Sequence, residues 1–168
     1  MAVGSDDSGT PFAASWNGVK WSVTNDGATG FGTLVGVSCL SPTWCISVGD
    51  YDNTRFVTPL IESWNGRAWT VDVSLIANLT LPKGSLDSVT CTSTTRCFAV
   101  GESNPNNPTP LIESWNGNKW SNQRLADSSA EPDANLTSVI CTSEASCVAI
   151  GYFGNPGSTD PFMEFTGP

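Results

Sequence analysis

A nine-residue phrase, TPLIESWNG, occurs twice without change in this chain, at Thr58–Gly66 and at Thr109–Gly117. A weaker copy, TPFAASWNG, spans Thr10–Gly18, and a degraded copy, DPFMEFTG, spans Asp160–Gly167. Repetition at a fixed period constrains the fold more than local propensity does, because each repeat must bury its apolar surface against its neighbours. The 168-residue chain is therefore expected to form a single repeat domain over residues 1–168.

The cysteines recur with the same period. Cys39, Cys91 and Cys141 stand about 50 residues apart, and each unit contains four β-like stretches separated by turn residues. The first stretch ends in Val-Gly or Ile-Gly, the second is the PLIESW phrase, the third begins with another tryptophan, and the fourth ends at a cysteine. Seven Trp, 16 Gly and 11 Pro are also typical of β-structure with many turns. The pattern predicts an all-β protein.

Asn-Gly follows each complete copy of the phrase and is the strongest signal for a two-residue hairpin loop. With such a loop, Trp64 is expected to pair with Arg67, and Glu62 with Trp69. Side chains alternate along a strand, so Trp64 and Trp69 would share one face and lie diagonally within reach of each other. We interpret the repeated tryptophans as structural packing residues: Trp16, Trp21, Trp64, Trp69, Trp115 and Trp120.

All six cysteines fall in C-x5-C pairs that bracket a short turn between two predicted strands. The two members of a pair should lie opposite each other across a hairpin, at a separation that suits a disulfide. Zinc is the alternative, but structural zinc sites favour cysteines two to four residues apart or histidine ligands, and this chain has no histidine. We predict three disulfides: Cys39–Cys45, Cys91–Cys97 and Cys141–Cys147.

Residues 97–120, CFAVGESNPNNPTPLIESWNGNKW, contain a hydrophobic strand ending in glycine, a variable loop, a strand ending in an aromatic residue, a short turn and a tryptophan. In this order the unit resembles a kelch-like repeat. It has one glycine (Gly49, Gly101 or Gly151) where kelch motifs usually have two. It is also similar to the Cys-rich SCxSxxxCxAVG…WNGxxW repeats of secreted actinomycete proteins.

This resemblance implies a β-propeller of four-stranded antiparallel blades with the Val-Gly strand innermost. Cut at Val-Gly, the chain contains three full blades, at about 2–40, 45–91 and 97–141, and a half blade at 147–167. Propellers usually have four to eight blades. The chain is therefore expected to be a piece of a larger propeller, to close as a compact ring, or to close one ring as a homo-oligomer. A β-trefoil is the alternative fold.

The net charge of −9 opposes binding to nucleic acid and to anionic membranes, and no cluster of Lys or Arg offers a local exception. No apolar run reaches the length of a membrane-spanning helix. The first ten residues lack the features of a signal peptide. Because the cysteine pairs indicate an oxidising compartment, we expect a secreted, extracellular protein that normally follows an export signal.

The absence of histidine removes the common nucleophilic triads and histidine-based metal centres. Glu62, Glu113 and Glu164 recur at equivalent repeat positions, whereas a catalytic carboxyl pair needs two different environments. We interpret them as structural residues at a blade rim, and we expect no enzyme activity. A glycoside-active enzyme remains a less favoured alternative.

No cofactor is expected. Asp50, Asp52 and Asn53 could ligate Ca2+ through their oxygens, but the remaining ligands of a known calcium loop are missing. Solvated loop residues are the commoner interpretation.

The loops after the Val-Gly strands differ completely between units, and loops on a rigid scaffold commonly carry function. We expect them to gather at one face of a ring and to bind a carbohydrate or a protein. A structural element that completes a propeller with another chain is the second hypothesis. Trp44, which has no counterpart in the other units, is the tryptophan expected to be most exposed. The candidate ligand-binding residues are Asp50, Tyr51, Asp52, Arg55, Glu102, Asn104, Tyr152, Asn155 and Trp44.

Overall fold

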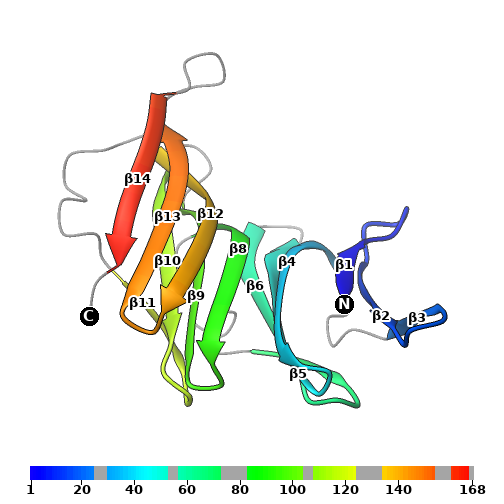
Figure 1. Ribbon diagram of the computed structural model, residues 1–168. Helices are drawn as coiled ribbons and strands as arrows, with labels where there is room; N and C mark the ends of the chain where they lie inside the picture. The colour runs from blue at the N-terminus through cyan, green and yellow to red at the C-terminus, as the bar shows by residue number, and fades with distance from the viewer. Residues whose placement is uncertain are drawn as a thin grey trace.

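The computed structural model describes residues 1–24, 30–52, 57–72, 83–103, 108–123, 134–153 and 160–166, with Phe153 and the last range described by their backbone alone. These residues contain fourteen β-strands in four antiparallel sheets (Figure 1). The prediction of an all-β protein is confirmed.

The first sheet contains β1 (Ala2–Ser5), β2 (Pro11–Trp16) and β3 (Trp21–Thr24). The second contains β4 (Phe31–Ser41), β5 (Trp44–Asp52), β6 (Val57–Trp64) and β7 (Trp69–Val71). The third contains β8 (Gly84–Ser93), β9 (Arg96–Ser103), β10 (Thr109–Trp115) and β11 (Trp120–Asn122). The fourth contains β12 (Ala134–Ser143), β13 (Ser146–Phe153) and β14 (Asp160–Thr166).

The sheets begin one strand earlier than the predicted blades. The last three begin at Phe31, Gly84 and Ala134, whereas the blades were expected to begin near 45, 97 and 147. The reason is the C-x5-C hairpin, whose two strands hydrogen-bond to each other and so belong to one sheet. The described residues therefore form two four-stranded and two three-stranded sheets, rather than three full blades and a half blade.

In the last three sheets the Val-Gly strands, β5, β9 and β13, are second, which corrects the expectation that they are innermost; in the first sheet the Val-Gly strand β1 lies at the edge. Neighbouring sheets converge instead at their first strands, because β8 contacts both β4 and β12. Two hydrogen bonds join these strands: the Ser38 hydroxyl accepts from the Cys91 N–H at 3.1 Å, and the Ser88 hydroxyl accepts from the Val139 N–H at 3.2 Å.

The glycine that ends each Val-Gly pair is required by close backbone packing. A Cβ atom added to Gly101 would collide with the carbonyl oxygen of Ser85 on β8, and Gly49 and Gly151 meet the same obstacle on their own neighbouring strands. The backbones of the two strands come this close next to a β-bulge, at which one extra residue shifts the register of the first strand.

The hairpin after each PLIESW phrase has a four-residue loop, not the two-residue loop that was predicted. Trp64 pairs directly with Trp69, and Glu62 pairs with Val71. The Asn65 side-chain oxygen accepts hydrogen bonds from two backbone N–H groups of the loop, at 2.9 and 3.0 Å. This Asx turn lengthens the loop by two residues, which preserves the side-chain alternation. The two tryptophans consequently share one face, as expected, but lie opposite rather than diagonal.

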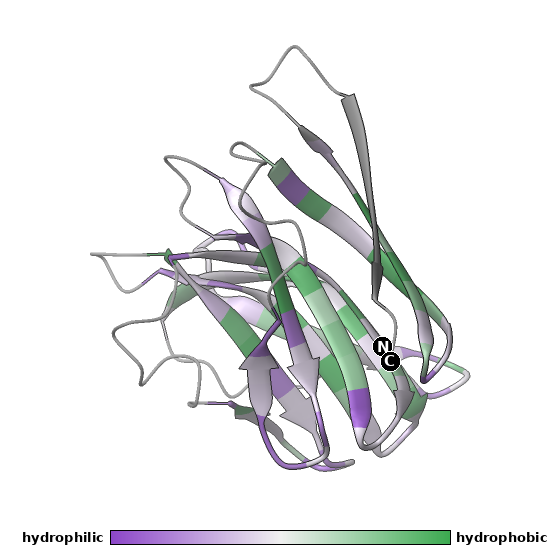
Figure 2. Ribbon diagram, turned by 90° about the vertical axis from the view of Figure 1, so that its left-hand side faces the viewer, coloured by the Kyte–Doolittle hydropathy of each residue, from purple (hydrophilic) through white to green (hydrophobic). Residues whose placement is uncertain are grey.

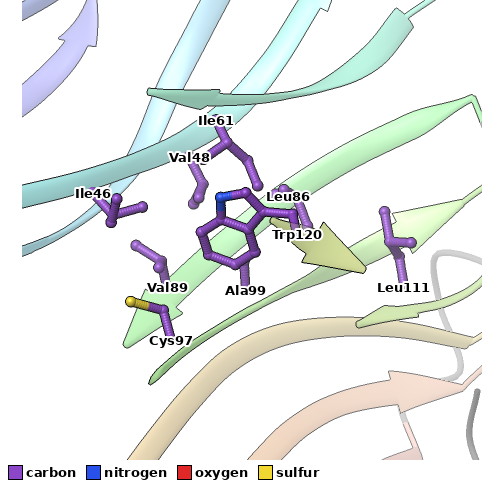
Figure 3. Close-up of a cluster of buried hydrophobic side chains, with 9 residues drawn as sticks. All are labelled: Ile46, Val48, Ile61, Leu86, Val89, Cys97, Ala99, Leu111 and Trp120. Atoms are coloured by element: carbon purple, nitrogen blue, oxygen red, sulfur yellow. The ribbon is translucent and has the colours of Figure 1, made fainter. Parts of the chain in front are cut away.

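The sheets pack face to face in chain order, and the first and fourth lie at opposite ends of the row (Figure 1). Hydrophobic residues are concentrated in the strands rather than in the turns (Figure 2). One core cluster joins the second and third sheets (Figure 3). The second sheet contributes Ile46, Val48 and Ile61, and the third contributes Leu86, Val89, Cys97, Ala99, Leu111 and Trp120.

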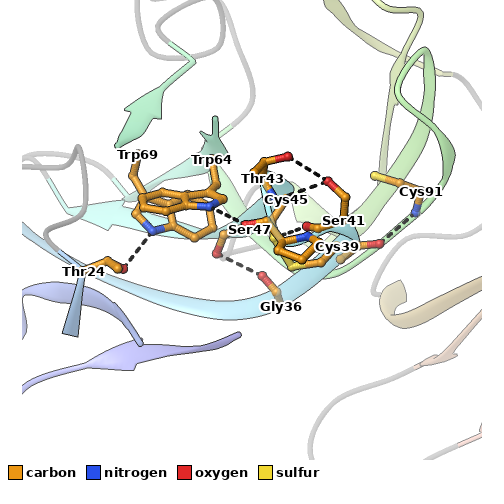
Figure 4. The surroundings of a disulfide bond; sticks show 12 residues. Thr24, Gly36, Cys39, Ser41, Thr43, Cys45, Ser47, Trp64, Trp69 and Cys91 are labelled. Atoms are coloured by element: carbon orange, nitrogen blue, oxygen red, sulfur yellow. Dashed lines mark hydrogen bonds between the residues drawn. A yellow bond between two sulfur atoms is a disulfide. The ribbon is translucent and has the colours of Figure 1, made fainter. Parts of the chain in front are cut away.

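The three predicted disulfides are confirmed, and the described residues contain no free cysteine. Each joins a first strand to the Val-Gly strand of the same sheet. Around Cys39–Cys45, the Trp64 indole donates to the Pro42 carbonyl at 3.1 Å, so the hairpin turn is tied to the next strand (Figure 4). Three disulfides in a chain of this size are typical of folding in an oxidising compartment.

Candidate functional site

The ends of the Val-Gly strands place acidic side chains from adjacent sheets close together. Asp87 on β8 lies within electrostatic range of both Asp50 on β5 and Glu102 on β9. We call these three carboxyl groups the acidic end. Asp52, at the end of β5, lies beside Asp50.

The environment of the acidic end disfavours the charged form of each carboxyl. Burial raises the pKa of Asp50, and the charges of Asp52 and Asp87 raise it further. Burial likewise raises the pKa of Glu102, with a second contribution from the charge of Asp87. A positively charged ligand group placed here would reverse the electrostatic part of these shifts.

Asp87 is held by polar neighbours. Burial raises the pKa of its carboxyl, and hydrogen bonds from Asn135 and Ser85 partly oppose that rise. The Ser85 hydroxyl lies 3.5 Å from one Asp87 oxygen. Asn135 belongs to the first strand of the next sheet, so this contact spans the boundary between the third and fourth sheets.

Asn135 continues the polar surface to the fourth sheet. Its side chain is 9% exposed, and its Nδ2 donates to the Tyr152 hydroxyl at 3.3 Å. Its Oδ1 is buried and accepts no hydrogen bond from any of the described residues. Tyr152 is 37% exposed and therefore presents an aromatic ring next to the acidic end.

Apart from Trp44, the predicted ligand-binding residues fall into three groups. Asp50, Asp52, Glu102 and Tyr152 lie at the strand ends that form the acidic end and its immediate surroundings. Tyr51 instead packs against the cluster of Leu34 and Leu60, between the first and second sheets. The remaining loop residues, Arg55, Asn104 and Asn155, lie outside the described residues.

Trp44 does not have the exposure that was expected of it. It packs, partly buried, against the core cluster between the second and third sheets. The exposed tryptophans are Trp16 and Trp21, at 50% and 54%. Trp44 was singled out because it has no counterpart in other units, but a unique residue in a hairpin can still turn inward onto the neighbouring sheet.

Asp87 and Asn135 were not identified from the sequence, although a signal was present. Asp87 occupies the β-bulge of its strand, where the equivalent residues are Val35 and Thr137. Bulges redirect side chains and are common near functional sites. A comparison of bulge positions between the repeats would have selected Asp87 as the one acidic residue among them.

The repeated glutamates are buried between sheets, not at a rim. Glu62 and Glu113 are 0% and 1% exposed. Burial raises the pKa of Glu113 to about 7, although a hydrogen bond from the Asn122 amide, at 3.3 Å, opposes the rise. The Glu164 side chain lies outside the described part of the structure.

The calcium hypothesis has no geometric support in the described ranges, where no three acidic or thiol side chains converge as metal ligands. Asn53, one of the proposed ligands, falls outside these ranges. Within the same ranges there is no helix long and apolar enough to cross a membrane.

No protein-family model matches this chain, and no curated protein matches it significantly.

Proposed function

We propose that this protein is an extracellular, propeller-like binding module that captures a positively charged protein segment at the acidic end. The observation that carries the proposal is the position of Asp87 within electrostatic range of Asp50, on the adjacent sheet, and of Glu102, on its own sheet. Burial raises the pKa of all three carboxyls, and the charge of Asp87 raises those of Asp50 and Glu102 further. A Lys or Arg side chain inserted between these groups would relieve their repulsion and gain charge-assisted hydrogen bonds.

The propeller part of this proposal rests on the repeated sheet plan. In such a propeller the first strands β4, β8 and β12 would be the inner blade strands, since neighbouring sheets contact one another through them. In the second and third sheets the disulfide hairpin lies at the opposite end from the acidic residues. A propeller with this plan presents its loops at one face, which suits recognition by loops on a rigid scaffold.

A binding role agrees with the electrostatics better than catalysis does. General acid and base catalysis by carboxyls usually pairs groups whose pKa values are pushed apart. At the acidic end, the pKa values of Asp50, Asp87 and Glu102 all move upward. Carboxyls whose pKa values are all raised are better suited to attract a cation together than to act separately as a general acid and a general base.

A carbohydrate ligand is the second candidate, favoured by Tyr152. Its ring is partly exposed next to Asn135, an arrangement of aromatic plane and amide that suits stacking and hydrogen bonding of a sugar. Such binding would depend on shape and hydrogen bonds, and its affinity would change little with ionic strength.

Calorimetric titration with short Lys- and Arg-rich peptides and with neutral oligosaccharides tests the proposal. We expect the peptides to bind, with an affinity that falls as salt rises and falls further in Asp87→Asn. The matched control is Glu144→Gln, which removes one exposed carboxyl from the disulfide turn of the fourth sheet.

If a neutral oligosaccharide binds and the peptides do not, the ligand is a carbohydrate and the proposal of a cationic peptide ligand is wrong. An equal loss of peptide affinity in Glu144→Gln and Asp87→Asn would show that net charge, rather than the acidic end, attracts the peptide.

A further inference from the structure

Two sheet faces in the described part of the chain have no neighbouring sheet. On the first sheet, Trp16, Trp21 and Val23 share the face directed away from the second sheet, and we call it the aromatic end face. On the fourth sheet, Ile140 and Ile150 share the face directed away from the third sheet, and we call it the aliphatic end face.

The exposure of the aromatic end face is exceptional for its position in the repeat. Trp21 is 54% exposed, whereas the equivalent residues Trp69 and Trp120 are 4% and 6% exposed. Trp16 is 50% exposed, against 9% for Trp64. The side chains are the same and their hairpins are alike, so the difference arises because none of the described sheets packs on this face.

The aliphatic end face shows the same contrast. Ile150 is 47% exposed. The residues at the equivalent position of the second and third sheets, Val48 and Val100, are both 0% exposed. Ile140, on the adjacent strand of this face, is 65% exposed. Exposed aliphatic and aromatic residues that gather on one face mark an interaction surface more often than scattered ones do.

The internal interfaces between sheets show how faces of these two kinds are buried against each other. Between the second and third sheets, the aliphatic residues Ile46, Val48 and Ile61 pack against the aromatic side of the next sheet, which includes Trp120 (Figure 3). The same order holds between the first and second sheets, where Val3 and Ala13 pack with Trp64 and Trp69. In each case the aliphatic face of one sheet covers the aromatic face of the sheet that follows it.

We propose that the aliphatic end face of one copy of this chain packs on the aromatic end face of a second copy, and so continues the internal sheet-to-sheet interface between molecules. The contact is heterologous, because two different surfaces meet, and it can therefore close into a ring or extend as a chain of molecules. It does not depend on the binding function proposed for the acidic end.

The chemistry of the two faces fits this partner. The residues that define them are apolar and uncharged, whereas the chain as a whole carries a net charge of −9. Association must overcome that repulsion, so we expect it to strengthen with added salt, as apolar contacts between like-charged molecules do. A contact made by surface ion pairs would weaken with salt instead.

Sedimentation velocity on the full chain, over the micromolar range, tests the proposal with two substitutions. Trp21→Lys removes the aromatic end face, and Ile150→Lys removes the aliphatic one. We expect each to weaken self-association by roughly tenfold or more, as truncation of a buried aromatic or aliphatic interface residue does. Circular dichroism shows whether each variant remains folded.

Mixing the two variants gives the decisive result. Each retains the face that the other has lost, so the mixture should form a one-to-one dimer that cannot grow further. The control is Val19→Asn, which removes an apolar side chain that is 82% exposed but belongs to the hairpin loop, where the third sheet has the exposed Asn118. This control should associate like the unmodified chain.

A monomeric unmodified chain throughout the concentration range overturns the proposal, and so does a mixture that fails to form the dimer. If either lysine variant is unfolded, Val23→Lys and Ile140→Lys replace it, because both positions are more exposed, at 70% and 65%. Association of either folded variant at the unmodified strength would also contradict the proposed contact.

Discussion

The tryptophan pair occurs three times in the chain with nearly the same geometry but not with the same burial. The ring centroids of Trp16–Trp21 and Trp64–Trp69 lie 5.7 and 5.5 Å apart, with similar tilts. The first pair is half exposed, whereas the second is almost fully buried. The hairpin alone therefore determines how the rings meet each other, and the adjacent sheet determines whether they belong to a core.

Hydrogen bonds show the same division between local and tertiary structure. The Trp64 indole donates to the Pro42 carbonyl in the disulfide turn of its own sheet, while the Trp69 indole donates to the Thr24 hydroxyl of the first sheet. Two indole N–H groups of one pair are thus satisfied by two different partners, which supports their burial.

The largest expected difference between the two pairs is in stability. Trp69→Ala should lower the free energy of unfolding by about 3–5 kcal/mol, the range for removing a large aromatic side chain from a core. Trp21→Ala should lower it by only about 1 kcal/mol, because half of that side chain already contacts solvent. Urea denaturation of both variants, followed by circular dichroism, measures the difference.

Equal losses in these two variants would show that the first pair is covered in solution under the conditions used. The measurement should therefore be made at several protein concentrations, since a loss from Trp21→Ala that grows with concentration reports association rather than folding.

A buried carboxyl distinguishes the third sheet from the first. Glu113 is 1% exposed, and the equivalent residue of the first sheet is Ala14. Because burial raises the Glu113 pKa from its ordinary value of 4.5 to about 7, the folded state binds this proton more tightly than the unfolded state does. Its contribution to stability is present below about pH 4.5 and is lost as the pH rises to about 7.

The size of this effect follows from the shift in pKa. The free energy of unfolding should fall by roughly 3 kcal/mol across that pH range through Glu113 alone. Glu113→Gln, which remains uncharged, should remove this slope, whereas Glu144→Gln at an exposed turn should keep it. Denaturation midpoints at closely spaced pH values test this, and an unchanged slope in Glu113→Gln would contradict it.

The hairpins show how much of the fold the sequence could predict. Pairing of Cys91 with Cys97 followed from spacing alone, because a short turn brings the two strands together. The division of the strands into sheets could not be predicted in the same way. The Val-Gly strand β9 has a hydrogen-bonded neighbour on each side, and the local sequence does not indicate which connection between strands leads from one sheet to the next. The length of the loop at Asn65 was also missed, because Asn-Gly fits several turns and the Asx hydrogen bonds decide among them.

The candidate site was predictable in part for a similar reason. Asp50 and Glu102 were found because they follow repeated Val-Gly pairs, which places them at equivalent strand ends. Asp87 and Asn135 lie on first strands, where the side chain that reaches the site is selected by a bulge and by the packing of one sheet on the next. Contacts between sheets are tertiary, and a repeat pattern does not specify them.

The disulfide hairpins give a smaller expected effect. Replacing Cys91 and Cys97 together by serine should lower the free energy of unfolding by about 2 kcal/mol, because the bridge closes only a short loop. The same change at Cys141 and Cys147 should cost a similar amount, since both loops have the same sequence separation of 6. The first sheet has no such bridge among its described strands.

Chemical denaturation compares the two double variants. A much larger loss at Cys91 and Cys97, in the middle of the row of sheets, would show that the bridge also maintains packing against the neighbouring sheets, beyond its effect on the unfolded chain. Peptide mapping of the unmodified protein serves as the control, and it should link each cysteine to the one six residues away.

The smallest expected effect concerns the acidic end, where the third sheet has an acidic bulge residue, Asp87, and the neighbouring sheets do not. Asp87→Asn should lower the pKa values of Asp50 and Glu102, because the charge of Asp87 raises both, while the larger contribution from burial remains. The free energy of unfolding near neutral pH should change by less than about 1 kcal/mol, as is typical of partly exposed charge interactions. Carboxyl carbon shifts followed by NMR over a pH titration measure the pKa values, with Asp7→Asn in the first sheet's loop as the control. Unchanged titration of Asp50 and Glu102 in Asp87→Asn would mean that burial alone perturbs these carboxyls, and the electrostatic attraction proposed for a cationic ligand would lose its support.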